Sequence, residues 1–175
     1  MLIAKVKTIL SVIQKGAKCP MAERDELFKL AADGYKTMMW LEEHLEACGL
    51  EESLQHLVEL RVSQVEGCAL CLEMHRNDLR ALGEMEYWLS SLQSWRESPY
   101  FTLRERAALG WTEAVTLATE DQLLSDDIFR EALTQFNDKE LSDLTYLATS
   151  ASGWCRLCIV ACVSPENCKS SRAPR

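Results

Sequence analysis

Residues 66–75 read Glu-Gly-Cys-Ala-Leu-Cys-Leu-Glu-Met-His, and three of them can carry chemistry: Cys68, Cys71 and His75. On a helix these three positions stand at i, i+3 and i+7, so their side chains share one face. Gly67 interrupts the preceding helical pattern, which places Cys68 at the start of the next helix. Three leucines continue the same face, so we expect the thiols and the imidazole to border apolar packing: Leu72, Leu79 and Leu82.

The Cys68-x-x-Cys71 pair has the spacing of a redox-active dithiol. Two cysteines three residues apart at a helix start can close into a disulfide, and the helix N-terminus favours the thiolate, with pKa values of roughly 3.5–7.5 in such motifs. His75, one turn beyond Cys71, can take up or return a proton near neutral pH. Peroxide reduction needs such a set: a thiolate attacks the O–O bond and leaves a sulfenic acid, which a second thiol converts into a disulfide.

Apolar residues recur at helical spacing on both sides of this motif, and no stretch alternates with period two for long enough to propose a sheet. The sequence therefore predicts an all-α fold, a compact bundle of about six to seven helices. The first four expected helices cover residues 21–47, 51–65, 69–82 and 84–95. Three more begin at the capping box Thr102-x-x-Glu105, at Ser125 and at the capping box Asn137-x-x-Glu140, the last running to about residue 163.

One domain is expected over residues 21–163, with a further segment at each end. Residues 1–20 predict an amphipathic helix rather than a signal peptide, because Lys5 and Lys7 lie inside the would-be apolar segment. We expect this helix to pack on the domain or on another subunit, with binding to a membrane surface as the alternative. Residues 164–175 are polar and basic and predict a disordered tail.

The composition excludes several classes of protein. With 19 Lys and Arg against 27 Asp and Glu, the formal net charge is −8, and no basic run stands out, so nucleic acid is not an expected partner. No apolar run approaches the roughly 18 residues that a membrane span requires. The eight cysteines come with a full helical core and no export signal, which favours the cytoplasm. In that compartment a close Cys-x-x-Cys pair is typical of catalysis or metal binding.

The sequence around the motif resembles the AhpD-like alkylhydroperoxidase branch of the carboxymuconolactone decarboxylase family. The resemblance extends over about residues 27–163 and is carried by four stretches: 57–75, 95–99, 103–114 and 153–157. It implies a compact AhpD-like all-α fold that assembles as trimers or hexamers. It also implies that Cys71 is the thiol that attacks peroxide, that Cys68 is the resolving thiol, and that His75 relays protons.

The chain departs from this family where a proton-relay glutamate is common, twelve residues before the first motif cysteine. His56 stands there, and an imidazole can also accept a proton. Glu59 lies one turn further on and Glu66 lies two residues before Cys68, so either carboxylate can substitute for the missing one. His56, Glu59 and Ser63 group together on the helical wheel, which suits either a solvated face or a polar site.

Three further cysteines share one face of the last helix: Cys155, Cys158 and Cys162. Packing in the core is the leading interpretation, since free cysteine is commonly buried as a small apolar residue. A zinc or iron–sulfur site is the weaker alternative, because three ligands on one rigid helix do not easily converge on one metal. Accessory redox thiols are a third interpretation. We therefore expect no metal ligands and no cofactor.

The sequence thus predicts a cytoplasmic, homo-oligomeric, thiol-dependent peroxidase that acts on hydroperoxides. An external dithiol or a thioredoxin-like protein is expected to recycle the Cys68–Cys71 disulfide. The candidate catalytic residues are Cys71, Cys68, His75, His56, Glu59 and Glu66. Two alternatives remain open: a thiol–disulfide relay without substantial peroxidase turnover, and a redox sensor without turnover.

Overall fold

The structure, a computed structural model, describes residues 32–119 and 124–161. Seven α-helices and one short 3-10 helix make up the regular structure of these residues, and no strand is formed among them, so the all-α prediction is confirmed. The expected helix over residues 1–20, the start of the helix expected at 21–47, and the tail at 164–175 lie outside the described residues, as does Cys162.

The helix bounds follow the predicted segments closely. In chain order they are α3 (Ala32–Glu46), α4 (Glu52–Glu66), α5 (Ala69–Ala81), α6 (Glu86–Ser91), the 3-10 helix η1 (Leu92–Ser94), α7 (Leu103–Thr116), α8 (Asp126–Gln135) and α9 (Asp138–Val160). The segment expected as one helix at 84–95 is divided into α6 and η1.

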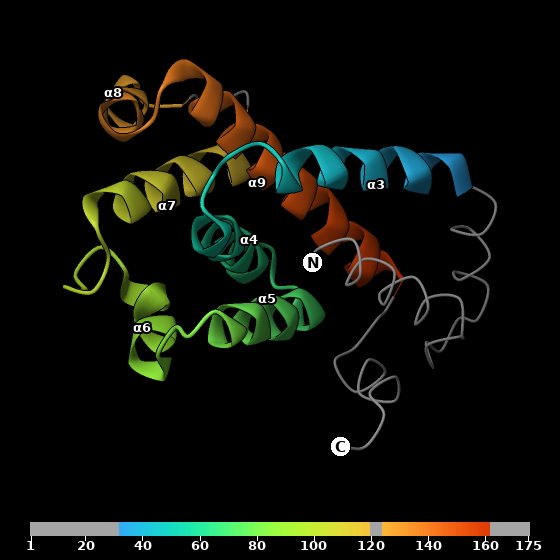
Figure 1. Ribbon diagram of the computed structural model, residues 1–175, viewed down its shortest axis with the longest axis horizontal. Coiled ribbons are helices and arrows are strands. Elements are labelled where there is room, and N and C mark those ends of the chain that lie inside the picture. The colour runs from blue at the N-terminus through green and yellow to red at the C-terminus, as the bar shows by residue number, and fades with distance from the viewer. Residues whose placement is uncertain (1–31, 120–123, 162–175) are drawn as a thin grey trace.

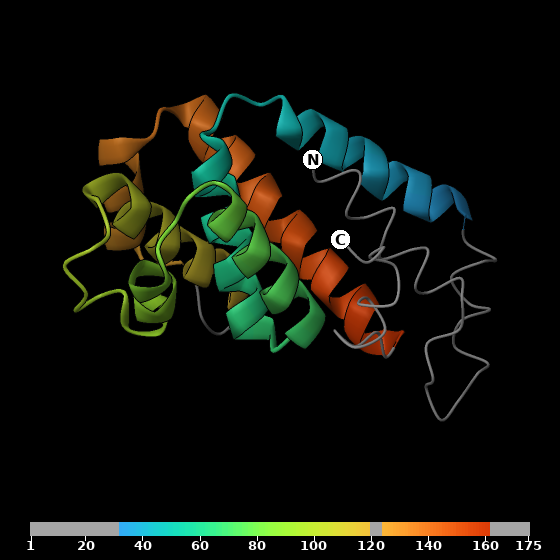
Figure 2. The ribbon, with the colours of Figure 1, turned by 60° about the horizontal axis from the view of Figure 1, so that its bottom comes forward.

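Helix α4 lies at the centre of the bundle, packed against α5, α7 and α9 (Figures 1 and 2). The long helix α9 crosses behind α4, with α3 along one side of it and α8 beside α7. Four tryptophans are buried among the described residues: Trp88, Trp95, Trp111 and Trp154. Helix α4, which carries the flank of the cysteine motif, is therefore held inside the bundle, and α5, which carries the motif, lies at the edge of the bundle against α4 (Figure 1).

Local sequence signals fix where the helices begin. Thr102 and Asn137 each accept a hydrogen bond from the backbone of the residue three positions on, and those residues, Glu105 and Glu140, reach back to the cap backbone. Both predicted capping boxes are confirmed, and Ser125 caps α8 as expected. Each cap pairs backbone N–H groups that a helix start would otherwise leave without partners.

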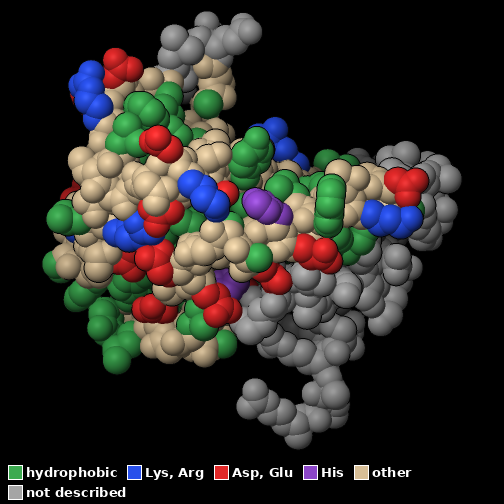
Figure 3. All heavy atoms as spheres, turned by 45° about the horizontal axis from the view of Figure 1, so that its top comes forward, with side chains coloured by type: hydrophobic (Ala, Val, Ile, Leu, Met, Phe, Trp, Pro, Cys, Tyr) green, Lys and Arg blue, Asp and Glu red, His purple; other side chains and the backbone are tan. Residues whose placement is uncertain are grey.

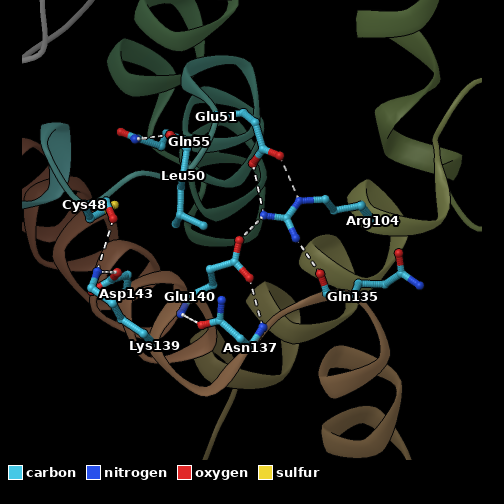
Figure 4. A network of polar contacts seen from close by, with 10 residues as sticks. All are labelled: Cys48, Leu50, Glu51, Gln55, Arg104, Gln135, Asn137, Lys139, Glu140 and Asp143. Carbon is cyan, nitrogen blue, oxygen red and sulfur yellow. Dashed lines mark hydrogen bonds and ion pairs between the residues drawn. The ribbon is translucent and has the colours of Figure 1, made fainter.

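A polar network around Arg104 ties the start of α4 to α7 and α9 (Figure 4). The guanidinium donates to Glu51 at 3.0 Å, to Glu140 at 2.8 Å and to the backbone carbonyl of Gln135. The guanidinium carbon of Arg104 also lies 4.2 Å from the centre of the Phe136 ring. Because one side chain binds three segments, the network fixes the position of α9 relative to α4.

The surface of the described residues mixes charged and apolar side chains (Figure 3). The length and hydropathy that a membrane-crossing helix requires are not met by any of the helices described. Some large apolar side chains are nevertheless well exposed, among them Trp40, Leu103 and Tyr146.

Candidate active site

The turn between α4 and α5 positions the cysteine pair. Gly67 ends α4 with a φ of 74°, a left-handed conformation that costs glycine little because it has no Cβ. Cys68 follows with an extended backbone as the N-cap of α5, and its Sγ accepts a hydrogen bond from the N–H of Cys71 at 3.3 Å. The prediction that Cys68 stands at a helix start is confirmed.

Cys68 and Cys71 are joined by a disulfide, with their Cα atoms 5.3 Å apart. Each residue is only 2% exposed, and the leucine at the buried centre of the predicted stripe, Leu79, is fully buried. Leu82, at the end of that stripe, is exposed. The pair therefore lies in a shielded position at the N-terminus of α5, where backbone N–H groups stabilise a thiolate when the disulfide is reduced.

Three buried side chains form an acid–base cluster beside the motif: His56 and Glu59 on α4, and His75 on α5. Glu59 Oε2 lies 2.7 Å from Nδ1 of His56 and 2.9 Å from Nδ1 of His75. One carboxylate oxygen therefore contacts both imidazoles. Of the two interpretations of the face shared by His56, Glu59 and Ser63, the polar site is correct and the solvated face is wrong, because all three side chains are buried.

The cluster holds its negative charge on Glu59. Burial raises the pKa of this carboxyl group, but the positive charge of His75 and the hydrogen bond with His56 outweigh burial and lower the pKa from 4.5 to about 2. Glu59 is thus ionised at neutral pH, and its Oε2 holds Nδ1 of His56 by a hydrogen bond.

Further carboxylates lie at the margins of the acid–base cluster. Asp78 Oδ2 is 4.0 Å from Nδ1 of His75, and Glu52 Oε1 is 3.9 Å from Nε2 of His56. His56, His75 and Asp78 each offer a ligand atom within 4.8 Å of the others, so these are the residues of this cluster that could hold a metal ion. Nδ1 of His56 is hydrogen-bonded to Glu59, whereas Nδ1 of His75 approaches Glu59 without hydrogen-bond geometry and Nε2 of His56 has no hydrogen-bond partner among the described residues.

Glu66 has a different environment. Its carboxylate accepts a hydrogen bond from Ser152 at 2.5 Å and forms an ion pair with Arg156 at 3.1 Å, both on α9. Of the two carboxylates that the sequence offered as substitutes for a relay glutamate, the structure brings only Glu59 into contact with His75. Glu66 instead ties the end of α4 to α9.

A second buried carboxylate, Glu42 of α3, was not predicted from the sequence. It accepts hydrogen bonds from Trp154 Nε1 at 2.8 Å and from the hydroxyl of Ser150, and only 1% of the residue is exposed. Burial and the nearby charge of Glu59 raise its pKa, against the opposing effect of these hydrogen bonds. A signal was present: Glu42 stands four residues after Met38 and three before Leu45, on the inward side of the helix.

Cys155 of α9 lies next to the disulfide. The Sγ atoms of Cys68, Cys71 and Cys155, which we call the thiol cluster, lie within 4.8 Å of one another, and the hydroxyl of Ser63 is 3.7 Å from the Cys155 sulfur. The prediction that Cys155 and Cys158 are buried is confirmed. For Cys155, packing is not the whole description, since its thiol contacts the motif. The disulfide form leaves Cys68 and Cys71 without the thiolates that a metal would need.

A depression of about 860 Å³ opens beside the first turns of α5. Ala69 and Leu72, which flank the cysteines in sequence, contribute to its wall. The rest of the lining is polar and includes Arg61, Gln64, Arg76 and Arg80.

Comparison with known proteins identifies relatives over most of the chain. The model of the carboxymuconolactone decarboxylase family matches residues 26–114. Uncharacterized protein YdfG from Bacillus subtilis (strain 168) is 29% identical over 139 residues, which cover 79% of this chain and 94% of that protein.

Solved structures share the fold. A protein of unknown function from Agrobacterium tumefaciens, ATU0492, suggested to be the antioxidant defence protein AhpD, is 34% identical with a TM-score of 0.72, covering 84% of this chain and 94% of that one. The debrominase Bmp8 has a TM-score of 0.71 at 12% identity, covering 95% of this chain and 89% of its own. The second likeness concerns the fold alone.

Proposed function

The chain belongs to the carboxymuconolactone decarboxylase family, and from that premise we propose that it is a thiol-dependent peroxidase that reduces hydroperoxides at Cys68 and Cys71. The observation that carries the proposal is the position of the disulfide at the start of α5, with His75 of the acid–base cluster one turn further along the same helix. The likeness to ATU0492, which has been suggested to serve antioxidant defence, agrees with it.

The reaction begins from the reduced pair. The Cys71 thiolate attacks one oxygen of the hydroperoxide, the O–O bond breaks, and the departing alkoxide takes a proton to leave as the alcohol. Cys71 is then a sulfenic acid. The Cys68 thiol condenses with it, forming the Cys68–Cys71 disulfide and releasing water. Two thiols and one hydroperoxide thus give one disulfide, one alcohol and one water.

The acid–base cluster supplies the proton movements in this scheme. His75 takes the thiol proton of Cys71 and returns it to the leaving oxygen. Glu59, ionised and in contact with both imidazoles, stabilises the protonated ring. His56 contacts the same oxygen of Glu59 as His75 does, so it extends the relay and holds the carboxylate in place. We assign the relay carboxylate to Glu59 and not to Glu66, which pairs with Arg156.

The burial of the disulfide favours small reactants. Because Cys68 and Cys71 are each 2% exposed, a folded protein disulfide cannot bring its sulfur atoms into line with theirs without movement of the bundle. A hydroperoxide approaches from the depression beside Ala69 and Leu72. A small dithiol then regenerates the pair by the same route, and a thioredoxin-like protein does so after the same movement of the bundle. The proposal places this cycle in the cytoplasm, where such reductants are maintained.

We further propose that the protein is a homo-oligomer, a trimer or hexamer. Trp40 is 76% exposed and Leu103 is 73% exposed, so both side chains are available for contacts between subunits. Light scattering coupled to gel filtration tests this: a mass of three or six chains is expected, and a monomer at micromolar concentration contradicts it.

The experiment that tests the function treats the reduced protein with cumene hydroperoxide. Thiol loss is followed by mass spectrometry and Trp fluorescence by stopped flow. The expected result is rapid loss of two thiols with formation of the Cys68–Cys71 disulfide, abolished in Cys71→Ser and preserved in the matched control Cys158→Ser. A rate no better than that of free cysteine would reject the peroxidase and leave the thiol–disulfide relay and the sensor as the functions to test.

A further inference from the structure

The thiol cluster contains one more cysteine than the proposed cycle uses. We propose that Cys155 is a third redox cysteine of this centre, which attacks the Cys68–Cys71 disulfide at Cys71 and converts it into a Cys71–Cys155 disulfide. The proposal concerns the fate of the disulfide and holds for any oxidant that forms it, so it does not depend on peroxidase activity.

The geometry that carries the inference is the mutual approach of three sulfur atoms. Cys68 and Cys71 come from the start of α5 and Cys155 comes from the last third of α9, yet their Sγ atoms lie within 4.8 Å of one another. Thiol–disulfide exchange requires the attacking sulfur to approach along the line of the bond that breaks. The three sulfur atoms are close but not in line, so a side-chain rotation within the thiol cluster brings Cys155 into position. Cys155 is 1% exposed, so an external thiol does not compete with it for this position.

The structure also indicates which sulfur leaves. Cys68 is the N-cap of α5, and its Sγ accepts the hydrogen bond from the Cys71 N–H. A helix N-terminus stabilises a thiolate, and the sulfur that is the better thiolate is the better leaving group in exchange. Attack by Cys155 on Cys71 therefore releases Cys68 into the position that best stabilises its charge.

The step is balanced without any further reagent. The bond between Cys155 and Cys71 forms as the bond between Cys71 and Cys68 breaks, and the proton lost by Cys155 is taken up by Cys68. No net oxidation or reduction occurs. Burial raises the pKa of Cys155 to about 11, although the hydrogen bond with Ser63 opposes this, so at neutral pH the residue rests as a thiol and exchanges only as its proton leaves.

Two consequences follow for the centre. A Cys71–Cys155 disulfide would link α5 to α9, two helices that already pack together, while leaving Cys68 as a nucleophilic thiol at the helix start. In addition, an oxidised Cys71 could be resolved by either neighbour. A protein that lacks Cys68 should therefore still close a disulfide at Cys71.

The test uses the positions of the tryptic cleavage sites. Cleavage after Arg61 and Arg76 releases Cys68 and Cys71 together in peptide 62–76, and cleavage after Lys139 and Arg156 releases Cys155 alone in peptide 140–156. Cys158 falls in the following peptide, 157–169. A cross-link between 62–76 and 140–156 thus reports Cys155 without interference from the other cysteines of α9.

The reduced Cys68→Ser protein is oxidised with diamide, quenched in acid, blocked with N-ethylmaleimide and digested. We expect the cross-linked pair of peptides as the main product of Cys71. The cross-link should be lost in Cys68→Ser/Cys155→Ser and retained in the matched control Cys68→Ser/Cys158→Ser. Cys155→Ala replaces the serine variant if circular dichroism shows that the latter is unfolded.

A second arm follows exchange in the wild-type chain. The protein carrying the Cys68–Cys71 disulfide is incubated without oxidant and quenched in the same way, and a fraction should show the 62–76/140–156 cross-link with Cys68 alkylated. Absence of the cross-link in the wild-type arm overturns the proposed exchange whatever the first arm shows, and its absence in the Cys68→Ser arm overturns it by showing that Cys155 does not reach Cys71. So does a reduced protein that retains zinc through Cys155, because Cys155 would then be a metal ligand. Since neither arm contains peroxide, failure of the peroxidase assay remains a separate result.

Discussion

The carboxylate of Glu59 on α4 lies 2.9 Å from Nδ1 of His75 on α5, and both side chains are buried. This contact joins the helix that carries the cysteine pair to the helix that precedes it. It gives the imidazole one turn after Cys71 a fixed negative partner. In the proposed cycle, Glu59 lies against the imidazole that moves the proton of Cys71.

The first prediction tests which of the two candidate carboxylates, Glu59 or Glu66, acts in the proton relay. Glu59→Gln removes the charge that stabilises protonated His75, so we expect oxidation of Cys71 by cumene hydroperoxide to slow by roughly 100-fold. Glu66→Gln is the matched substitution on the same helix and should leave the rate within about twofold, because that carboxylate pairs with Arg156. Stopped-flow Trp fluorescence measures both. Equal slowing of the two variants would remove Glu59 from the relay.

The second prediction concerns acid stability. The pKa of Glu59 is about 2 in the folded protein against 4.5 for an ordinary glutamate, so its stabilising contribution is complete above pH 4.5 and is lost as the pH falls towards 2. Integrated over that shift, the contribution is roughly 3 kcal/mol. Urea titrations at pH 7 and pH 3 should show a smaller fall in the free energy of unfolding for Glu59→Gln than for the wild type. If the free energy of unfolding falls equally in the wild type and in Glu59→Gln, the low pKa assigned to Glu59 is contradicted.

Much of the fold could be predicted because its determinants are local. The capping boxes at Thr102 and Asn137 and the glycine at 67 fix helix ends through backbone hydrogen bonds within a few residues. Apolar spacing then identifies the inward faces. These signals require no knowledge of which helix packs against which.

The site could be predicted only in part, because it depends on contacts between helices. A helical wheel shows that His56 and Glu59 share a face, but only the packing of α5 shows that the face is covered and that His75 lies there. Cys155 was placed correctly in the core, yet its approach to Cys68 and Cys71 depends on how α9 crosses α4 and α5. Sequence spacing on α9 alone could not reveal this.

The third prediction concerns a buried ionic network that holds α7 to α4. Glu113 accepts hydrogen bonds from Trp95 Nε1 at 2.8 Å and from Arg61 Nε at 2.8 Å, and pairs with Arg96 at 2.5 Å. Burial opposes ionisation, but these partners lower the pKa of Glu113. Glu113→Gln leaves Arg61 without its charge partner and should reduce the free energy of unfolding by about 3 kcal/mol.

Urea denaturation at pH 7 checks this value. The neighbouring exposed residue Glu97 provides the control, since Glu97→Gln should change stability by less than about 0.5 kcal/mol. If both variants unfold at the same urea concentration as the wild type, the network around Glu113 contributes nothing to stability.

The fourth prediction concerns Glu42, where the substitution should stabilise the protein at pH 7 instead of destabilising it. Burial and the charge of Glu59 raise its pKa, so its contribution to stability is complete below the ordinary pKa of a glutamate and is lost as the pH rises through the raised value. Glu42→Gln keeps an oxygen for Trp154 and removes the need to bury a charge. We expect it to raise the free energy of unfolding at pH 7 by about 1 kcal/mol. The gain should be smaller at pH 4, where the carboxyl group binds a proton.

Glu43→Gln is the matched control for Glu42, because the adjacent residue on α3 is exposed. It should leave stability unchanged at both pH values. If Glu42→Gln instead destabilises the protein at pH 7 as strongly as Glu59→Gln, then Glu42 is ionised and its charge is required by His75. The acid–base cluster would in that case contain two working carboxylates. The two substitutions therefore distinguish a site with one ionised carboxylate from a site with two, in a single set of urea titrations.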